Sequence, residues 1–269
     1  MNSVNRFVCL NKSISRRIRS HLPQAKTDLQ EEYARLVARY MNSQPGMTVA
    51  DIGGGRSSAF AKYVDLGGRS RIIAVDISPD ELAQNHEADE KRVADVTRHL
   101  PLEPGEVDMI VSKSVLEHLV DVDAFVQKAA RVLPPGGYFV SVFPSKYALY
   151  SIINRMLPRR VSNWVLRVLI PGSEGILGFP VYYDNCTPSA MMRVLRRNGF
   201  EITDIRVSYG QTDYFAFLLP LYLLVALFEM VLMALGLKNL AATVLITARR
   251  TEAPLNQENQ RLTTVSTAG

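Results

Sequence analysis

Val49-Ala50-Asp51-Ile52-Gly53-Gly54-Gly55 is the stretch that decides the fold of this 269-residue chain. The apolar segment 48–52 predicts a short strand, and the glycines predict a tight turn at its end. Glycine lets the backbone approach a ligand closely and adopt positive φ. We expect a helix through about residue 66 to follow, and its N-terminus would add backbone donors beside the turn. The stretch therefore predicts a ligand-binding unit at the start of a sheet.

Strand and helix patterns alternate on both sides of this unit. A helix is expected at 27–41, a helix start at 79–85, and a helix with an apolar face after the fourth strand. Further strands are predicted at 71–76, 92–94, 107–112 and 138–143, and later at 202–208 and 242–248. Strands separated by helices are typical of a parallel sheet covered on both faces. The fold class is therefore α/β, doubly wound.

Polar side chains follow the predicted strands where ligands bind in such sheets. Asp76 ends the second strand, where an acid can bind ribose hydroxyls. A dinucleotide-binding protein would show the same acid, but its glycine pattern would place a third glycine at Ser58. Asp95 follows the third strand, where it can accept from an exocyclic amine. Ser112 leaves the fourth strand at the same edge.

As a set, five segments resemble the successive motifs of class I S-adenosylmethionine-dependent methyltransferases. They are Val49–Gly55, Ala74–Ser78, Ala94–Val96, Val107–Ser112 with Leu116–Leu119, and Arg131–Gly137. The resemblance covers residues 47–143 in the right order and spacing. One departure is Ser57, which stands where the family's first motif has its third glycine. The family's fold implies a seven-stranded, mostly parallel sheet whose last strand is antiparallel and lies between the fifth and sixth.

The resemblance implies that S-adenosylmethionine is the cofactor. Gly53 and Gly55, with Gly54 between them, would line its methionine part, and Ser112 its methionine end. The remaining contacts implied are Asp76 with Ile77 at the ribose, and Asp95 with Val96 at the adenine. Asp51 would orient the glycine turn or a water near the methionine amine, or it would cap a helix.

His118 is the only histidine near these motifs after the fourth strand, and it is the candidate general base. The Glu-His-Leu sequence around it is widespread in the family whatever the acceptor, so the alternative is a structural role. Cys9 and Cys186 have no metal-ligand spacing, and no metal site is expected. The net charge of +5 comes from local clusters, which does not favour a nucleic-acid partner.

The segment 215–235 carries Glu229 as its only charge and is about long enough to cross a bilayer. A single crossing would pull the last strand out of the sheet, so we expect an apolar hairpin that dips into the membrane surface. The arginine-rich, amphipathic segment 146–180 favours the same surface. The expected location is cytoplasmic, peripheral at the inner face of the membrane. A hydrophobic homodimer interface is the alternative.

The domain organisation expected is a basic arm at 1–26, disordered or an amphipathic helix, then a methyltransferase domain at 27–250. Insertions at 146–180 and 214–237 interrupt this domain, and a disordered tail follows at 251–269. The predicted function is methyl transfer to a small or amphipathic acceptor, such as a quinone or phenolic lipid or a lipid-linked sugar. The alternatives are a soluble small-molecule methyltransferase with a hydrophobic dimer interface, and a non-catalytic membrane-docked domain.

Overall fold

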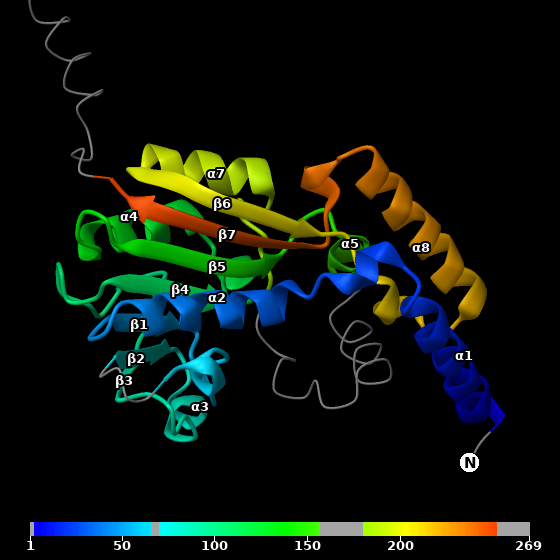
Figure 1. Cartoon of the computed structure of the whole chain (residues 1–269), viewed down its shortest axis with the longest axis horizontal. Coiled ribbons are helices and arrows are strands. Elements are labelled where there is room, and N and C mark those ends of the chain that lie inside the picture. Colours follow the sequence, from blue (N-terminus) through cyan, green and yellow to red (C-terminus); the bar gives the residue numbers. More distant parts are fainter. Residues whose placement is uncertain (1–2, 66–69, 157–179, 252–269) are drawn as a thin grey trace, which may run out of the picture.

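A computed structural model of the chain describes residues 3–65, 70–156 and 180–251. Its seven strands form one sheet in the order β3-β2-β1-β4-β5-β7-β6 (Figure 1). The strands are β1 (Thr48–Ile52), β2 (Arg71–Asp76), β3 (Glu90–Val93), β4 (Met109–Lys113), β5 (Tyr138–Pro144), β6 (Phe200–Ser208) and β7 (Thr243–Arg250). The strands from β1 to β5 are parallel, and β7 runs antiparallel between β5 and β6. The predicted fold class and strand arrangement are therefore confirmed.

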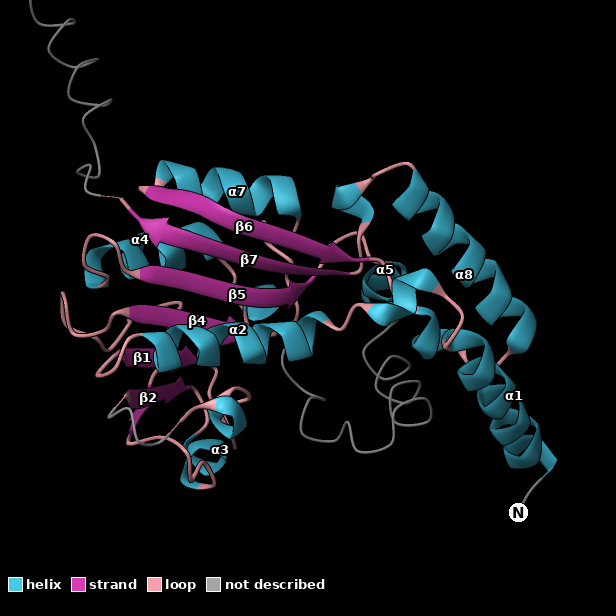
Figure 2. Ribbon diagram, viewed as in Figure 1, coloured by secondary structure: helices cyan, strands magenta, loops and turns pink. Residues whose placement is uncertain are grey.

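Helices cover both faces of this sheet (Figure 2). The helices in the described residues are α1 (Ser3–Arg19), α2 (Leu29–Ser43), α3 (Pro79–Ala83), α4 (Val122–Val132), α5 (Leu149–Met156), α7 (Pro188–Arg197) and α8 (Leu219–Ala234). Of these, α1 and α8 lie beyond the end of the sheet and do not cover its faces. On β4, Met109 and Val111 pack against α2, while Ile110 points to the opposite face, in the core formed with α4 and α7. This period-two alternation gives two buried layers, as in other doubly wound sheets.

The helix expected between the glycine turn and residue 66 is wrong for residues 56–65, which form turns and the short 3-10 helix Ala61–Tyr63. Ser57 and Ser58 are weak helix formers. Phe60 is fully buried in the core beside α2, so tertiary packing stabilises turns here in place of an α-helix. The glycine turn therefore lies at the end of β1 without a following α-helix.

The first residues and the apolar run lie together at one end of the molecule. α1 packs along α8, beside the carboxyl ends of the parallel strands (Figure 1). The amphipathic-helix alternative for the N-terminal arm is therefore confirmed for Ser3–Arg19. Instead of a hairpin, the apolar run forms the single helix α8, with Pro220 in its first turn and Gly236 just after its end. No helix in the described ranges has the length and apolarity needed to span a bilayer.

Two predictions fall largely outside the described residues. Within the segment 146–180, the structure describes α5 and the residues beside it, while the arginine-rich part at 157–179 lies outside. The tail predicted at 251–269 also lies outside, apart from Thr251. The domain limits at 27 and 250 stay predictions.

Candidate functional site

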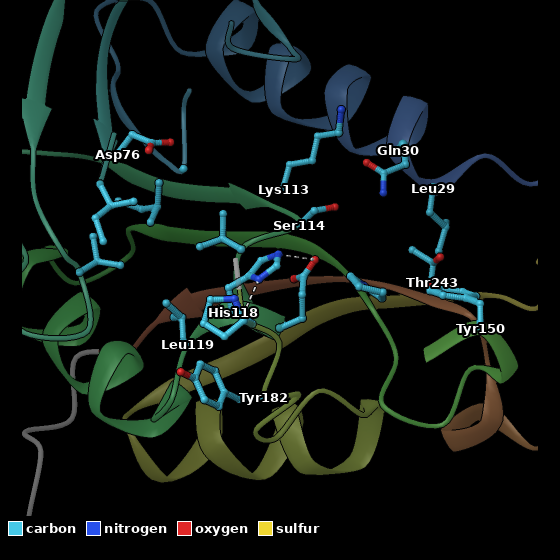
Figure 3. Close-up of a pocket in the computed structure, with 18 of the residues that line it drawn as sticks. Leu29, Gln30, Asp76, Lys113, Ser114, His118, Leu119, Tyr150, Tyr182 and Thr243 are labelled. Carbon is cyan, nitrogen blue, oxygen red and sulfur yellow. Dashed lines mark hydrogen bonds and ion pairs between the residues drawn. The ribbon is translucent and has the colours of Figure 1, made fainter. Parts of the chain in front are cut away.

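A pocket of about 820 Å³ opens at the carboxyl edge of the sheet. Its floor includes the last residues of β1, β2 and β4, namely Ile52, Asp76 and Lys113. Figure 3 shows Asp76 at one end, Tyr150 and Thr243 at the other, and His118 between them. Ligands bind at this edge in open α/β sheets, where polar groups at strand ends converge.

The glycine turn at the end of β1 is held in a conformation that favours glycine. Gly53 has a φ of 73°, and its N–H donates to the carbonyl of Val75 at 2.7 Å. A Cβ at Gly53 would lie 2.3 Å from Cγ2 of Val115, a residue that also lines the pocket. Gly55 has a φ of 38°. The bare backbone thus leaves room for a ligand beside the turn, as the sequence predicted.

Asp76 ties this turn to β2. Its Oδ2 accepts from the N–H of Gly55 at 3.0 Å, and its Oδ1 accepts from the N–H of Ser78 at 2.9 Å. A carboxylate oxygen can accept more than one hydrogen bond, so Asp76 can also take hydroxyl donors from a ligand. Ile77, which lines the same end, is 53% exposed.

Asp95 and Val96 line the pocket next to this end. Oδ1 of Asp95 accepts from the backbone N–H of Thr97 at 3.0 Å and from its hydroxyl. The hydroxyl of Thr97 is the main cause that lowers the pKa of Asp95. Asp95 is therefore ionised at neutral pH, which suits an acceptor for an exocyclic amine.

Asp51, Gly54 and Gly55 lie in a second hollow of about 640 Å³, and Gly53 and Lys113 line both hollows. Asp51 is buried, and burial raises the pKa of its carboxyl to about 7. Because no α-helix begins after the turn in residues 53–65, the helix-cap alternative for Asp51 is wrong. The other predicted role of Asp51, orienting the glycine turn or a water near the methionine amine, stays a prediction.

Ser112 is placed differently from the other predicted residues. Its buried hydroxyl lies 2.7 Å from the hydroxyl of Ser141 on β5. The next two residues, Lys113 and Ser114, line the pocket, whereas Ser112 is absent from the lining found among the described residues. Ser114 has a φ of 55°, which is uncommon outside glycine and costs backbone energy. The strained position therefore falls at the candidate site itself.

His118 lies in the middle of the pocket and is hydrogen-bonded to the loop at Pro180, which is distant in the sequence. Its Nδ1 is 2.9 Å from the carbonyl of Pro180, and the N–H of Tyr182 donates to the carbonyl of Glu117 at 2.8 Å. A carbonyl only accepts hydrogen bonds, so Nδ1 carries the proton. In a neutral ring the lone pair is then on Nε2.

Glu117 is a buried carboxyl at the same place. Its Oε1 lies 3.9 Å from Nε2 of His118, and its buried Oε2 has no hydrogen-bond partner among the described residues. Burial raises the pKa of Glu117 to about 8, so this carboxyl is mostly protonated at neutral pH. It therefore sits beside the histidine without adding a full negative charge.

The other end of the pocket is lined by residues that the sequence analysis did not assign to the site. Tyr150 of α5 stacks on Tyr214 with ring centroids 4.5 Å apart, and both line the pocket with Arg19 and Leu29. The hydroxyl of Tyr150 donates to the carbonyl of Ala242 at 3.2 Å. These residues are far apart in the sequence, and no local motif joins them. Tyr182 lines the pocket near His118 (Figure 3).

Metal ligation finds no support in this geometry. In the described ranges, no group of three or more His, Cys, Asp or Glu side chains is placed to hold a metal ion. Cys9 is exposed at one end of the molecule, and Cys186 is buried.

The strand order, the glycine turn and the acids after β2 and β3 agree with a class I S-adenosylmethionine-dependent methyltransferase domain. Residues 50–141 match the family described as "Methyltransferase domain". The resemblance drawn from the sequence motifs is therefore confirmed. The matched segment runs from β1 to β5 and contains the predicted cofactor residues from Asp51 to Ser112 as well as His118.

Two known proteins are similar to part of this chain, and one of them is named as a methyltransferase. An uncharacterized 37.1 kDa protein in transposon TN4556 of Streptomyces fradiae is 33% identical over 59% of this chain and 48% of its own length. A ubiquinone biosynthesis O-methyltransferase of Cupriavidus pinatubonensis is 27% identical over 60% of this chain and 63% of its own. The chain thus spans less than two thirds of these relatives.

The fold itself is shared with solved structures. An S-adenosylmethionine-dependent methyltransferase from Mesorhizobium loti superposes with a TM-score of 0.51 at 19% identity, covering 80% of this chain and 96% of that one.

Proposed function

We propose that this protein transfers the methyl group of S-adenosylmethionine to an amphipathic acceptor that carries a hydroxyl group. The observation that carries the proposal is one pocket with a polar end at Asp76 and Asp95, an aromatic end at Tyr150 and Tyr214, and His118 between them. A cofactor bound at the polar end and an acceptor bound at the aromatic end would meet near His118.

The polar end fits the cofactor. The glycine turn supplies bare backbone that a Cβ at Gly53 would fill, and Asp76 offers carboxylate oxygens to ribose hydroxyls. Asp95 is ionised and adjacent, and Val96 is an apolar neighbour for a base ring. The cofactor, when bound, supplies an already activated methyl group on a sulfonium. The work left to the protein is to hold the acceptor in line and to remove its proton.

His118 is the group proposed to take that proton. The hydrogen bond from Nδ1 to Pro180 fixes the ring and its tautomer, so Nε2 presents its lone pair. The bound cofactor would supply the methyl group to the acceptor oxygen, which would lose its proton in return. The hydroxyl proton passes to Nε2. A base of this kind contributes roughly 10²- to 10⁴-fold to the rate.

The aromatic end favours an acceptor with an aromatic or apolar body. Tyr150 and Tyr214 form a stacked pair, and Leu29 lies beside them at the pocket wall. Rings of this kind prefer offset or edge contacts with other rings. The relative from Cupriavidus pinatubonensis is named for methylation of oxygen in ubiquinone biosynthesis. Together these observations support a phenolic or quinone-like acceptor.

The experiment is to incubate the full chain with methyl-labelled S-adenosylmethionine and cell extract, and then to separate lipid, aqueous and protein fractions. Label in the lipid fraction that is lost in Asp76→Ala supports the proposal. Label only in the aqueous or protein fraction would retain methyl transfer and overturn the amphipathic acceptor. If no fraction is labelled, equilibrium dialysis with the labelled cofactor decides, because lack of binding would overturn the cofactor assignment as well.

A further inference from the structure

α8 has two sharply different faces. One side is buried on the domain through Tyr222, Val225, Ala226, Glu229 and Leu232. The other side is apolar and exposed, and its members are Leu223, Leu224, Leu227, Phe228, Val231 and Leu235. Leu224 is 64% exposed and Leu227 is 56% exposed. Contiguous exposed side chains of this kind mark an interaction surface.

The orientation of α8 is fixed by a buried carboxyl. Oε1 of Glu229 accepts from the N–H of Gln211 at 2.7 Å, and Oε2 accepts from Nε2 of Gln24 at 3.2 Å. Rolling the helix to bury its leucines would expose Glu229 and break both hydrogen bonds. The packing of α8 on the domain therefore fixes its apolar face on the exposed side.

α1 adds positive charge beside this face. Oδ1 of Asn11 in α1 accepts from the N–H of Leu219 in α8 at 2.8 Å. Arg19 of α1 forms an ion pair at 3.2 Å with Asp213, which lies in the 3-10 helix Thr212–Phe215 before α8. α1 contains no acidic residue, and Arg6, Arg16 and Arg17 are exposed. Its exposed apolar side chains are Phe7 and Leu10. An apolar surface flanked by cations matches the boundary of an anionic bilayer.

The same charge argues against a second copy of the chain as the occupant. A two-fold symmetric contact places the same patch on both partners, so the cations of one α1 would approach those of the other. With no acidic residue on α1 to compensate, this contact is unfavourable. Anionic lipid headgroups supply the missing countercharge.

We propose that the exposed sides of α1 and α8 form a surface that docks on an anionic phospholipid bilayer. The helices lie in the interface plane, with the leucines of α8 in the lipid and the arginines of α1 at the headgroups. Arg19 and Tyr214 belong to the same end of the molecule and line the pocket. Docking therefore places the aromatic end of the pocket close to the membrane, where an amphipathic acceptor resides.

The test is co-sedimentation of the full chain with phosphatidylcholine vesicles, with and without phosphatidylglycerol. We expect binding that requires phosphatidylglycerol and weakens with salt. The double variant Leu224→Glu/Leu227→Glu should lower the bound fraction about tenfold or more, because binding scales with buried apolar area. Val93→Glu is the matched control, since Val93 is similarly exposed on β3 at the far side of the sheet.

Arg16→Gln/Arg17→Gln supplies a second readout, and it decides the test if the leucine variant fails to fold. It should abolish the preference for phosphatidylglycerol while leaving the circular dichroism spectrum unchanged. Equal binding by parent and both variants would overturn the proposal. Absence of vesicle binding would also overturn it. If the parent protein then proved to be a dimer that Leu224→Glu/Leu227→Glu converts to a monomer, the apolar face would be a dimer interface instead.

The docking surface deepens the proposed function, but its test does not require catalysis. Asp76→Ala, which lacks the proposed cofactor contact, should bind vesicles like the parent protein. Vesicle binding without methyl transfer would thus contradict only the proposed function. Methyl transfer without vesicle binding would contradict only the docking surface.

Discussion

The backbone N–H of Gly55 donates a hydrogen bond to Oδ2 of Asp76 at 3.0 Å and so joins the end of β1 to the end of β2. The acid proposed to bind ribose therefore also shapes the turn proposed to hold the methionine part. Loss of this carboxylate should affect both contacts together.

Asp76→Asn tests this coupling. Asparagine has one acceptor oxygen in place of two, so it can keep the hydrogen bond from Gly55 or the one from Ser78 but not both. The charge-assisted bond that is lost is worth about 1.5–3 kcal/mol. We expect the dissociation constant for S-adenosylmethionine, measured by calorimetry, to rise at least about tenfold. Asp80→Asn, at an exposed acid on α3, is the matched control and should leave it unchanged. Equal affinities of parent and Asp76→Asn would remove Asp76 from the cofactor site.

Gly53→Ala tests the glycine turn. The new Cβ meets Val115 at 2.3 Å, and the φ of 73° is unfavourable for alanine. We expect urea unfolding to show a loss of about 2–4 kcal/mol, combining strain and overpacking. Gly46→Ala isolates the strain, since Gly46 has a φ of 86° with no atom within 4 Å of the added Cβ. It should cost only about 1–2 kcal/mol.

A second substitution checks the origin of the larger loss. Val115→Ala removes the Cγ2 atom that the new Cβ would meet in Gly53→Ala, so the double variant should recover part of the stability. No recovery would show that the contact with Val115 is not the cause.

His118→Asn separates the two roles of the histidine. The asparagine Nδ2 can replace Nδ1 as a donor to the carbonyl of Pro180, but it offers no basic nitrogen in place of Nε2. We expect cofactor affinity to be kept while kcat falls about 10²-fold or more. His118→Ala, which loses both roles, should also loosen the loop at 180–185. A kcat for His118→Asn close to that of the parent would show that His118 only positions the loop.

Glu229→Gln should change the pH dependence of stability. Burial raises the pKa of Glu229 from 4.5 to about 7, so the folded state binds this proton more tightly than the unfolded state. The free energy of unfolding therefore falls as pH rises from about 4.5 to 7, and this contribution is lost above pH 7. Glutamine stays neutral, and its oxygen can still accept from Gln211, whereas its amide nitrogen cannot accept from Gln24. At pH 8 the variant should be more stable than the parent by about 1–2 kcal/mol.

The comparison uses urea unfolding at pH 5 and pH 8. Other buried carboxyls contribute to the change in the free energy of unfolding with pH in both proteins. Only the difference between parent and variant therefore reports on Glu229. Glu201→Gln, at an exposed position on β6, is the control and should leave the slope unchanged. Parallel slopes for parent and Glu229→Gln would contradict the shift.

Local patterns in the sequence were enough to place most strands and the polar end of the pocket. Asp76 and Asp95 follow apolar segments, and parallel strands bring their carboxyl ends to one edge, so these acids had to meet. Gly53 has positive φ, which few other residues tolerate. The order of the last strands came from the family resemblance, because strand periodicity does not reveal which strands pair.

The sequence was misleading where packing competes with local preference. The segment after the glycine turn was predicted as a helix, but Phe60 enters the core beside α2 and the segment folds as turns. The family resemblance assigned Ser112 to the methionine end of the cofactor, whereas its hydroxyl lies against that of Ser141 on the neighbouring strand. A one-residue step along a strand reverses the direction of a side chain, so small differences in register decide which residue reaches the pocket.

By itself, the sequence determined the α/β class, the glycine turn and the acids of the cofactor end, because these depend on local periodicity and on backbone conformations that few residues adopt. Only the tertiary structure decided the aromatic end of the pocket and the outward face of α8. Tyr150 and Tyr214 are far apart in the chain and meet through packing. The sequence predicted that the apolar run dips into the membrane as a hairpin, with a dimer interface as the alternative. The structure shows a single helix, and the hydrogen bonds of Glu229 to Gln24 and Gln211 show which side of it faces the domain.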